Sequence, residues 1–282
     1  RIQALETGQV DVALAISTDQ IGQLEAAGHR VATRTPHRVY VFALQAEDPA
    51  SPFADVRIRQ ALNYAVNKDI LTDVLLAGLV QPVSQPALPL TDGYDPDLEP
   101  YPYDPDKARQ LMLEAGRADG FSFTLETVSN FMPNDAAILQ QIQSDLSDVG
   151  ITMDINVVTY PTILRATLFG ELGGEAMPTD FFDTTGDALR PFLSPLNHAC
   201  TGAGPWYCDE TIQLVIDEAR ITMDLDRRTA LTRQVVRHYR DDASSLFLFP
   251  VLGLDGLHKR VTKWKPWLDV LNYHLVDVDD AP

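Results

Sequence analysis

Two aspartates in the segment FFDTTGDALRPFL, residues 181–193, have the type and spacing of residues that do chemistry. Asp183 and Asp187 stand on either side of Thr-Thr-Gly, and the glycine lets the backbone approach a bound group closely. Carboxylates placed in this way can act as catalytic acids and bases, hold a metal ion, or pair with a positively charged ligand. The segment alone permits all three, so the rest of the chain has to decide.

The chain lacks the surroundings that catalysis would need. The run DTTGD is superficially like the Asp-Lys-Thr-Gly-Thr of phosphorylating ATPases, but it lacks the lysine, and no second acidic cluster follows it for magnesium. Paired carboxylates for glycoside hydrolysis stay possible, although nothing in the sequence determines their separation. No GxSxG elbow, HExxH helix or Walker loop is present. The sequence therefore disfavours an enzyme, and we expect neither a metal nor a cofactor.

The charge balance narrows the range of partners. The 282 residues include 40 acidic and 22 basic side chains, for a net charge of -18. Such a surface repels nucleic-acid phosphates and anionic lipid headgroups, so we expect neither as a partner. No stretch reaches the roughly 18 apolar residues of a membrane-spanning helix. The opening RIQALETGQVDVALAI has no initiator Met and is typical of the middle of a larger protein.

Cys200 and Cys208 flank a loop rich in glycine, HACTGAGPWYC. Their spacing excludes a CxxC redox pair, and His198 is the only histidine near enough in sequence to join them on zinc. A disulfide is the simplest interpretation and would stabilise the fold by roughly 2–3 kcal/mol. Because disulfides persist outside the reducing cytosol, the pair indicates an exported protein.

The hydrophobic patterns predict an α/β fold. Residues 10–16 and 38–45 are rich in β-branched and aromatic side chains, as buried strands are. Residues 121–128 and 151–158 alternate as strands do, while 134–150 repeats apolar side chains at helical spacing. This strand–helix–strand order predicts a parallel crossover.

Further along the chain, two amphipathic helices are predicted over 212–223 and 227–240. They lead into LFLFPVLGL, residues 246–254, a run apolar enough to predict a central strand.

Three linked motifs carry a resemblance to a known family. They are DVRIRQALNYAVNKDILTDVLLAG at 55–78, YDPDKARQLMLEAG at 103–116 and IQSDLSDVGITMDI at 142–155. In this order and spacing they resemble the peptide/nickel class, family 5, of bacterial extracellular solute-binding proteins. The opening ALETGQVDVAL fits the same family, and the resemblance covers essentially the whole chain.

The resemblance implies a type II periplasmic-binding-protein-like fold, in which two lobes close on a ligand. It assigns residues 1–41 to a hinge-side lobe, 42–253 to a second ligand-binding lobe with a mixed sheet flanked by helices, and 254–282 to a return to the hinge-side lobe. Family members catalyse nothing and deliver cargo to the transmembrane subunits of an ABC permease. We therefore expect a peptide-binding monomer in the periplasm or outside the cell. An upstream signal peptide and ligand lobe are expected too, with an upstream lipid anchor as the only membrane attachment.

The resemblance also answers the question of the two aspartates. In the family, an aspartate of such a loop pairs with the α-amino group of a bound peptide, and a buried ammonium needs a carboxylate partner. The implied ligand contacts are Asp183, Thr185, Gly186 and Asp187, with Phe182 or Phe181 where the family usually has Trp. The alternative is a loop whose aspartates accept hydrogen bonds from turn N–H groups.

A second set of candidates lies in the turn after residues 121–128. It comprises Ser129, Asn130 and Phe131. In the dipeptide-binding branch an Arg in this turn clamps the peptide carboxylate, but the chain has VSNFMPND and no Arg there. This difference favours longer peptides or an uncharged solute. The Cys200–Cys208 pair, in contrast, resembles the dipeptide branch, which has a disulfide-like pair in the same loop.

Other interpretations stay open. Tyr94 and Tyr101 could line the cleft, although packing on their own lobe is favoured, and a lone His198 is more often structural. The same fold could bind an oligosaccharide or a nickel chelate, present a solute to a receptor, or hydrolyse a peptide.

Overall fold

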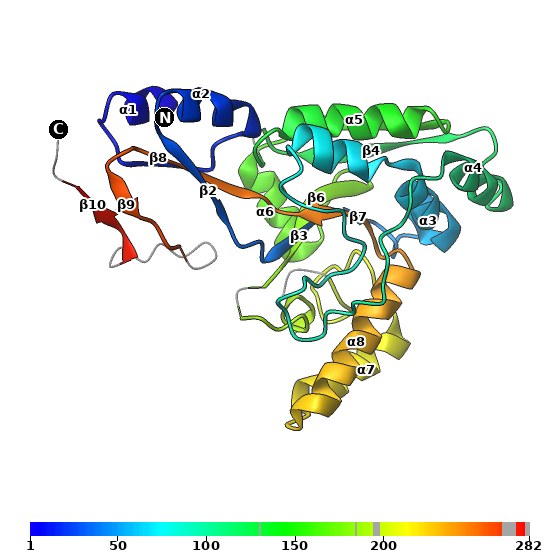
Figure 1. The fold of residues 1–282 in the computed structure, drawn as a ribbon. Helices are drawn as coiled ribbons and strands as arrows, with labels where there is room; N and C mark the ends of the chain where they lie inside the picture. The colour runs from blue at the N-terminus through cyan, green and yellow to red at the C-terminus, as the bar shows by residue number, and fades with distance from the viewer. Residues whose placement is uncertain (130, 184, 194–197, 267–274, 280–282) are drawn as a thin grey trace.

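The strands form sheets of five, three and two strands in the computed structural model, which describes residues 1–129, 131–183, 185–193, 198–266 and 275–279 (Figure 1). In spatial order, the large sheet contains β5 (Ile151–Val157), β4 (Phe121–Thr127), β6 (Ala176–Phe182), β3 (Arg38–Leu44) and β7 (Ser245–Pro250). The small sheet contains β1 (Val12–Leu14), β8 (Gly253–Leu257) and β2 (Arg30–Arg34). The remaining pair is β9 (Val261–Lys263) and β10 (Asp277–Val278).

The large sheet is mixed, as predicted. β4 pairs in parallel with β5 and β6, whereas β3 pairs antiparallel with β6 and β7. The predicted parallel crossover is confirmed, with α5 (Asp135–Ser147) joining β4 to β5. The fold is therefore α/β.

Helices cover both faces of the large sheet. Successive side chains of a strand point to opposite faces, and β3 shows the result. Tyr40 and Phe42 belong to the core shared with α5 and with α3 (Val56–Ala65), whereas Val39 and Val41 pack towards α7 (Glu210–Ile221) and α8 (Leu225–Asp241). The other described α-helices are α1 (Ile2–Glu6), α2 (Ile21–Ala26), α4 (Pro105–Glu114) and α6 (Tyr160–Phe169). A π-helix spans Ile70–Leu75, and short 3-10 helices span Thr18–Gln20, Pro52–Ala54 and Arg190–Leu193.

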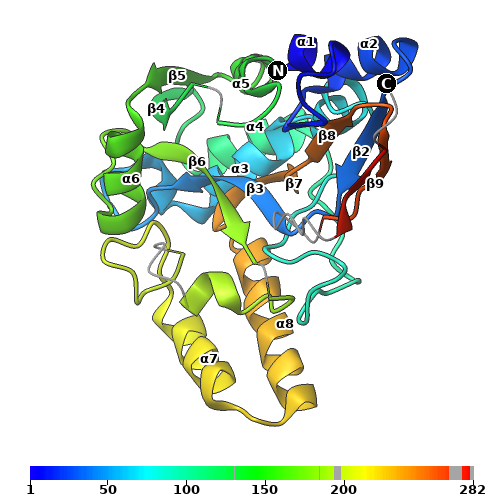
Figure 2. The same ribbon diagram turned by 90° about the vertical axis from the view of Figure 1, so that its left-hand side faces the viewer.

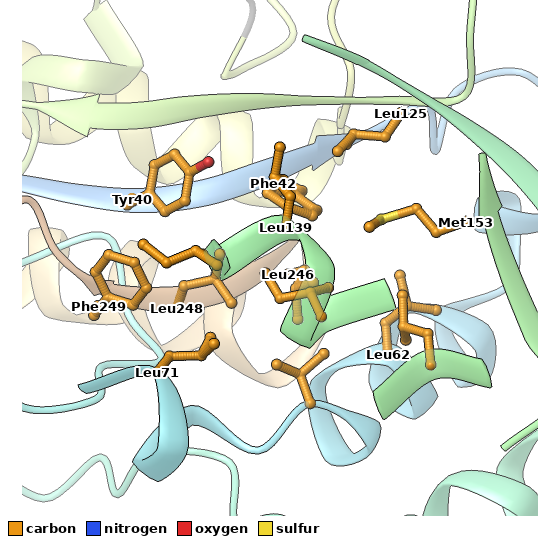
Figure 3. Packing of buried hydrophobic residues seen from close by; sticks show 14 of the residues in the cluster. Tyr40, Phe42, Leu62, Leu71, Leu125, Leu139, Met153, Leu246, Leu248 and Phe249 are labelled. Atoms are coloured by element: carbon orange, nitrogen blue, oxygen red, sulfur yellow. The ribbon is translucent and has the colours of Figure 1, made fainter. Parts of the chain in front are cut away.

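The core between the sheet and α5 is formed by large apolar side chains. Figure 3 shows Phe42 of β3 and Leu246 of β7 lying beside Leu139 of α5. Burying one such side chain contributes roughly 1.5–3 kcal/mol. On the opposite face, α7 and α8 form the predicted pair of helices, which extends away from the sheet in both views (Figures 1 and 2).

The prediction of one central strand over residues 246–254 is wrong. The run divides into β7, at the edge of the large sheet, and β8, in the middle of the small sheet. The edge of β7 is covered by Asn63 of α3, whose Oδ1 accepts from Phe247 N at 3.1 Å and whose Nδ2 donates to Ser245 O at 2.9 Å. Val83 N adds a bond to Leu248 O at 3.2 Å. The apolar sequence thus reflects burial of an edge strand and not a central position.

The chain passes between the two larger sheets twice, at residues 35–37 and 251–252. The division expected after residue 41 falls inside β3, which pairs in the large sheet from Arg38 onwards. The division expected after residue 253 falls one residue into β8. Two such connections are typical of a hinge. The assignment of the two sheets to two lobes stays a prediction.

The expected disulfide is present. Cys200 and Cys208 are bonded, with their Cα atoms 4.6 Å apart. The loop that they close places Trp206, 2% exposed, against Ala43 and Met177 of the large sheet.

Candidate functional site

A crevice of about 690 Å³ lies between the N-terminal segment and the turn that joins β4 to α5. One wall contains Arg1, Ala15, Ser17, Asp19 and Gln20, and the other contains residues 131–137. Its volume is that of a typical small-ligand site. The predicted residue Phe131 lines it, Ser129 lies just beyond it, and Asn130 lies outside the described residues.

The second wall is held together by its own hydrogen bonds. Asp135, the first residue of α5, accepts from Phe131 N at 2.8 Å and from Ala136 N at 2.7 Å. A carboxylate at a helix N-terminus is stabilised by the helix dipole. Asn134 precedes it with φ 64°, a left-handed conformation that costs a non-glycine residue roughly 1–2 kcal/mol. The opposite wall contains a second such residue, Ala15 with φ 52°, and strain of this kind is concentrated at ligand sites.

Two carboxylates face the crevice from opposite walls, Asp19 and Asp135. Behind Phe131 lies Tyr40, with ring centroids 5.8 Å apart. Burial raises the pKa of the Tyr40 phenol well above its usual value, and the charges of Asp135 and Asp180 raise that pKa further. The Tyr40 hydroxyl is therefore protonated at neutral pH and can act as a hydrogen-bond donor.

From Tyr40, a polar strip continues along β3 and β6. Tyr40 is directly opposite Asp180, and Arg38 is directly opposite Phe182. The Arg38 guanidinium lies 3.4 Å from the Asp180 carboxylate and 5.7 Å from the centroid of the Phe182 ring. Phe182, 38% exposed, is thus connected to Phe131 through neighbouring side chains. Sequence reasoning missed Arg38, Tyr40 and Asp180, although the alternation of Arg38 and Tyr40 in HRVYVFAL places both on one face of the strand.

Asp183 lies inside the loop that follows β6. It is 4% exposed, and its carboxylate accepts from Thr185 N and Thr185 Oγ1, both at 2.7 Å, and from Asp187 N at 2.9 Å. These contacts give Asp183 a role in shaping the loop, which matches the alternative that the sequence left open. Whether it also contacts a ligand stays a prediction.

Asp187 has different partners. Its Oδ1 accepts from Leu189 N at 2.9 Å, and its Oδ2 forms an ion pair with Arg228 of α8. Gly186, with φ 79°, presents its carbonyl to Asp92 N at 2.7 Å. Thr185, Gly186 and Asp187 line a separate hollow of about 80 Å³ and not the 690 Å³ crevice. Phe131 therefore lines the crevice. The aspartate loop follows Phe182, at the other end of the strip, and lines a separate hollow.

The remaining candidates contribute to packing. The Tyr101 hydroxyl donates to Arg240 O at 2.6 Å, and the Tyr94 ring packs in a small cluster with Ala188 and Val236. His198 Nε2 bonds to Asp180 O at 3.0 Å, and burial lowers the pKa of His198 to about 4. The neutral imidazole therefore donates this hydrogen bond through Nε2.

The described residues contain neither a membrane-spanning helix nor a cluster suited to a metal ion. No described helix is long and apolar enough to cross a bilayer. Among the same residues, no group of three or more His, Cys, Asp or Glu side chains is placed to hold a metal ion.

Comparison with known proteins identifies the class. Residues 1–183 match the family described as bacterial extracellular solute-binding proteins, family 5 middle. The chain belongs to this family, which consists of solute-binding proteins and not of enzymes, and which acts outside the cytoplasm.

Three similar proteins show the range within the family. The dipeptide-binding protein of Escherichia coli is 30% identical over 216 residues, which is 74% of this chain and 40% of that protein. The heme-binding protein A of Haemophilus influenzae is 34% identical over 162 residues, 52% of this chain and 28% of that protein. The solved structure of DppA from Helicobacter pylori with the peptide STSA has a TM-score of 0.86 at 24% identity, over 99% of this chain and 55% of that chain. The matched parts thus cover between 28% and 55% of the length of these three proteins.

Proposed function

We propose that this chain forms part of the ligand cleft of an ABC importer's solute-binding protein, which binds di- or oligopeptides and delivers them to the transmembrane permease. The observation that supports this most is the 690 Å³ crevice, because its two walls come from segments far apart in the sequence. A ligand held by both walls would favour the closed arrangement by its higher affinity for it.

The chemistry of the crevice suits a peptide with a free amine. Asp19 and Asp135 present negative charge from opposite walls, while the one described cation of the lining, Arg1, donates to the Leu14 and Ala15 carbonyls. Phe131 supplies an apolar surface. We retain the loop residues Phe182, Thr185, Gly186, Asp183 and Asp187 in the proposed site. Phe182 ends the strip that begins at Tyr40, and the Tyr40 ring contacts Phe131 in the crevice. In this proposal the ammonium group of the peptide is neutralised by carboxylates in a partly desolvated site.

The test is a thermal-shift screen of the complete protein against di- to pentapeptides, their N-acetylated forms, oligosaccharides, heme and nickel chelates. A ligand at 100 times its dissociation constant adds about 2.7 kcal/mol to the stability of the folded state. Stabilisation by free-amine peptides that is lost on acetylation supports the proposal. Stabilisation by heme, sugars or chelates alone would replace peptides by another cargo, a second candidate favoured by the heme-binding relative.

Variants then test the assigned residues. Phe131→Ala and Asp187→Asn should weaken binding of the stabilising peptide. Arg165→Gln is the control, because the Arg165–Glu171 pair on and beyond α6 is exposed on both sides. Unchanged affinity in both site variants would remove these residues from the site.

A further inference from the structure

A second hollow, of about 270 Å³, adjoins the crevice. Asp135 and Ala136 line both spaces, so the two spaces lie next to each other at the first turn of α5. A group bound in the crevice can therefore extend into the hollow without leaving the surface of the protein.

The walls of this hollow are largely apolar. Val128, Leu139, Ile155 and Val157 line it with apolar side chains. The polar side chains beside them are Thr127, Ser129 and Gln140, together with Asp135 at the end that the hollow shares with the crevice. Val157, the last residue of β5, is 58% exposed and presents its apolar side chain to solvent. Covering such a side chain with another apolar group is favourable, at roughly 25 cal/mol per Å² of apolar surface removed from water.

The position of the hollow in the fold also suits a ligand. It lies at the carboxyl ends of the parallel strands β4 and β5, next to the start of α5. In open α/β sheets, ligands bind outside the carboxyl ends of parallel strands. β5 is also the edge strand of the large sheet, so its outer side has no further described strand against it.

We infer that this hollow receives one bulky apolar side chain of the bound peptide, and so selects peptides that contain Leu, Ile, Val, Met or Phe. The inference rests on the proposed peptide binding and adds the class of side chain to it. The crevice supplies the polar contacts and the hollow supplies the preference.

The experiment is isothermal titration of the complete protein with trialanine and with the three tripeptides that replace one alanine by leucine. We expect at least one leucine peptide to bind about 10-fold more tightly than trialanine, which is the effect of burying part of one aliphatic side chain. Val157→Ser removes an apolar wall, and Gln140→Phe fills the hollow from α5. Each should reduce the leucine preference to about threefold or less, with the affinity for trialanine unchanged.

Leu214→Ser is the matched control, because Leu214 is 71% exposed on α7, in the helical pair that extends away from the sheet (Figure 2). This variant should keep the full preference. Equal binding of all four peptides to the wild type, or a preference that persists in both hollow variants, would overturn the inference and leave peptide binding intact. If none of the four peptides binds, the inference falls, and the wider screen of ligands decides the proposed function separately.

Discussion

The side-chain amide of Asn134 donates to Thr18 Oγ1 at 2.6 Å and so joins the two walls of the crevice. The same amide donates to Leu75 O at 2.8 Å, and the Thr18 hydroxyl donates to that carbonyl at 2.9 Å. The N-terminal segment, the π-helix and the β4–α5 turn therefore meet at three hydrogen bonds. Asn134 is suited to this position because asparagine tolerates the left-handed backbone better than most residues do.

Substitutions of Asn134 should separate the hydrogen bonds from the backbone strain. Asn134→Gly loses both side-chain bonds and should lower the free energy of unfolding by about 1–2 kcal/mol. Asn134→Ala should lose about 1 kcal/mol more, because alanine has to adopt φ 64°. Urea unfolding of the two variants measures both terms. An alanine variant at least as stable as the glycine variant would contradict the strain.

Asn63→Ala should expose the edge of β7. The substitution leaves Phe247 N and Ser245 O buried without their partner, and each such group costs about 1–3 kcal/mol. We expect a loss of about 2–4 kcal/mol in guanidinium unfolding, with increased light scattering at high concentration. Gln60→Ala on the same helix is the control, since it removes one bond to Asp241 O at an exposed site and should cost about 1 kcal/mol or less. Equal losses in the two variants would show that Asn63 does not protect the strand.

The two aspartates of the 183–187 loop should differ in their effect on stability. Asp183→Ala removes the acceptor of three hydrogen bonds at a 4% exposed site and should cost about 2–3 kcal/mol. Asp187→Ala breaks a partly exposed pair with Arg228 and should cost about 1 kcal/mol. Thermal unfolding without ligand checks the order of the two values. The reverse order would mean that Asp183 does not hold the loop.

Acid should destabilise the fold partly through His198. Burial lowers the pKa of His198 in the folded state to about 4, from the ordinary value of 6.5. The folded state thus binds this proton less readily than the unfolded state. The stability that depends on a neutral His198 is therefore fully present above about pH 6.5 and is lost as the pH falls towards 4. The loss in the free energy of unfolding is at most about 3 kcal/mol.

Substitution of His198 provides the test of this titration. His198→Gln keeps a donor for Asp180 O but does not titrate. The stability difference between the wild type and this variant should therefore shift in favour of the variant between pH 7 and pH 4.5. Denaturant unfolding at both pH values measures it, and parallel profiles would exclude the titration of His198 as a cause.

The elements were largely predictable from local sequence. The unit 121–157, the helices after residue 210 and the disulfide follow from periodicity, capping and cysteine spacing. The misassigned run 246–254 shows the limit of such patterns. Apolar residues indicate that a strand is buried. Whether its edge is covered by another strand or by a side chain such as Asn63 depends on contacts between residues far apart in the sequence.

The candidate site also contains residues that the sequence could predict and residues that it could not. Phe131 was predictable because the resemblance implies ligand contacts in the turn after residues 121–128, and it lines the crevice. Asp19 was not, because its wall belongs to a segment more than a hundred residues upstream. Likewise, only the register of β3 against β6 places Tyr40 opposite Asp180.

The sequence by itself determined the family, the α/β class and the disulfide, and it offered Phe131 and the aspartate loop as candidates. The tertiary structure decided which candidate side chains face a cavity and which form hydrogen bonds within the fold. Asp183 illustrates the reason, since a carboxylate in a buried loop is drawn to the nearest N–H groups, and those groups take position only when the loop closes. Pairing of strands and closing of loops join residues far apart in the sequence. Local hydrophobic periodicity shows which face of an element is buried, but it does not name the distant element that covers that face.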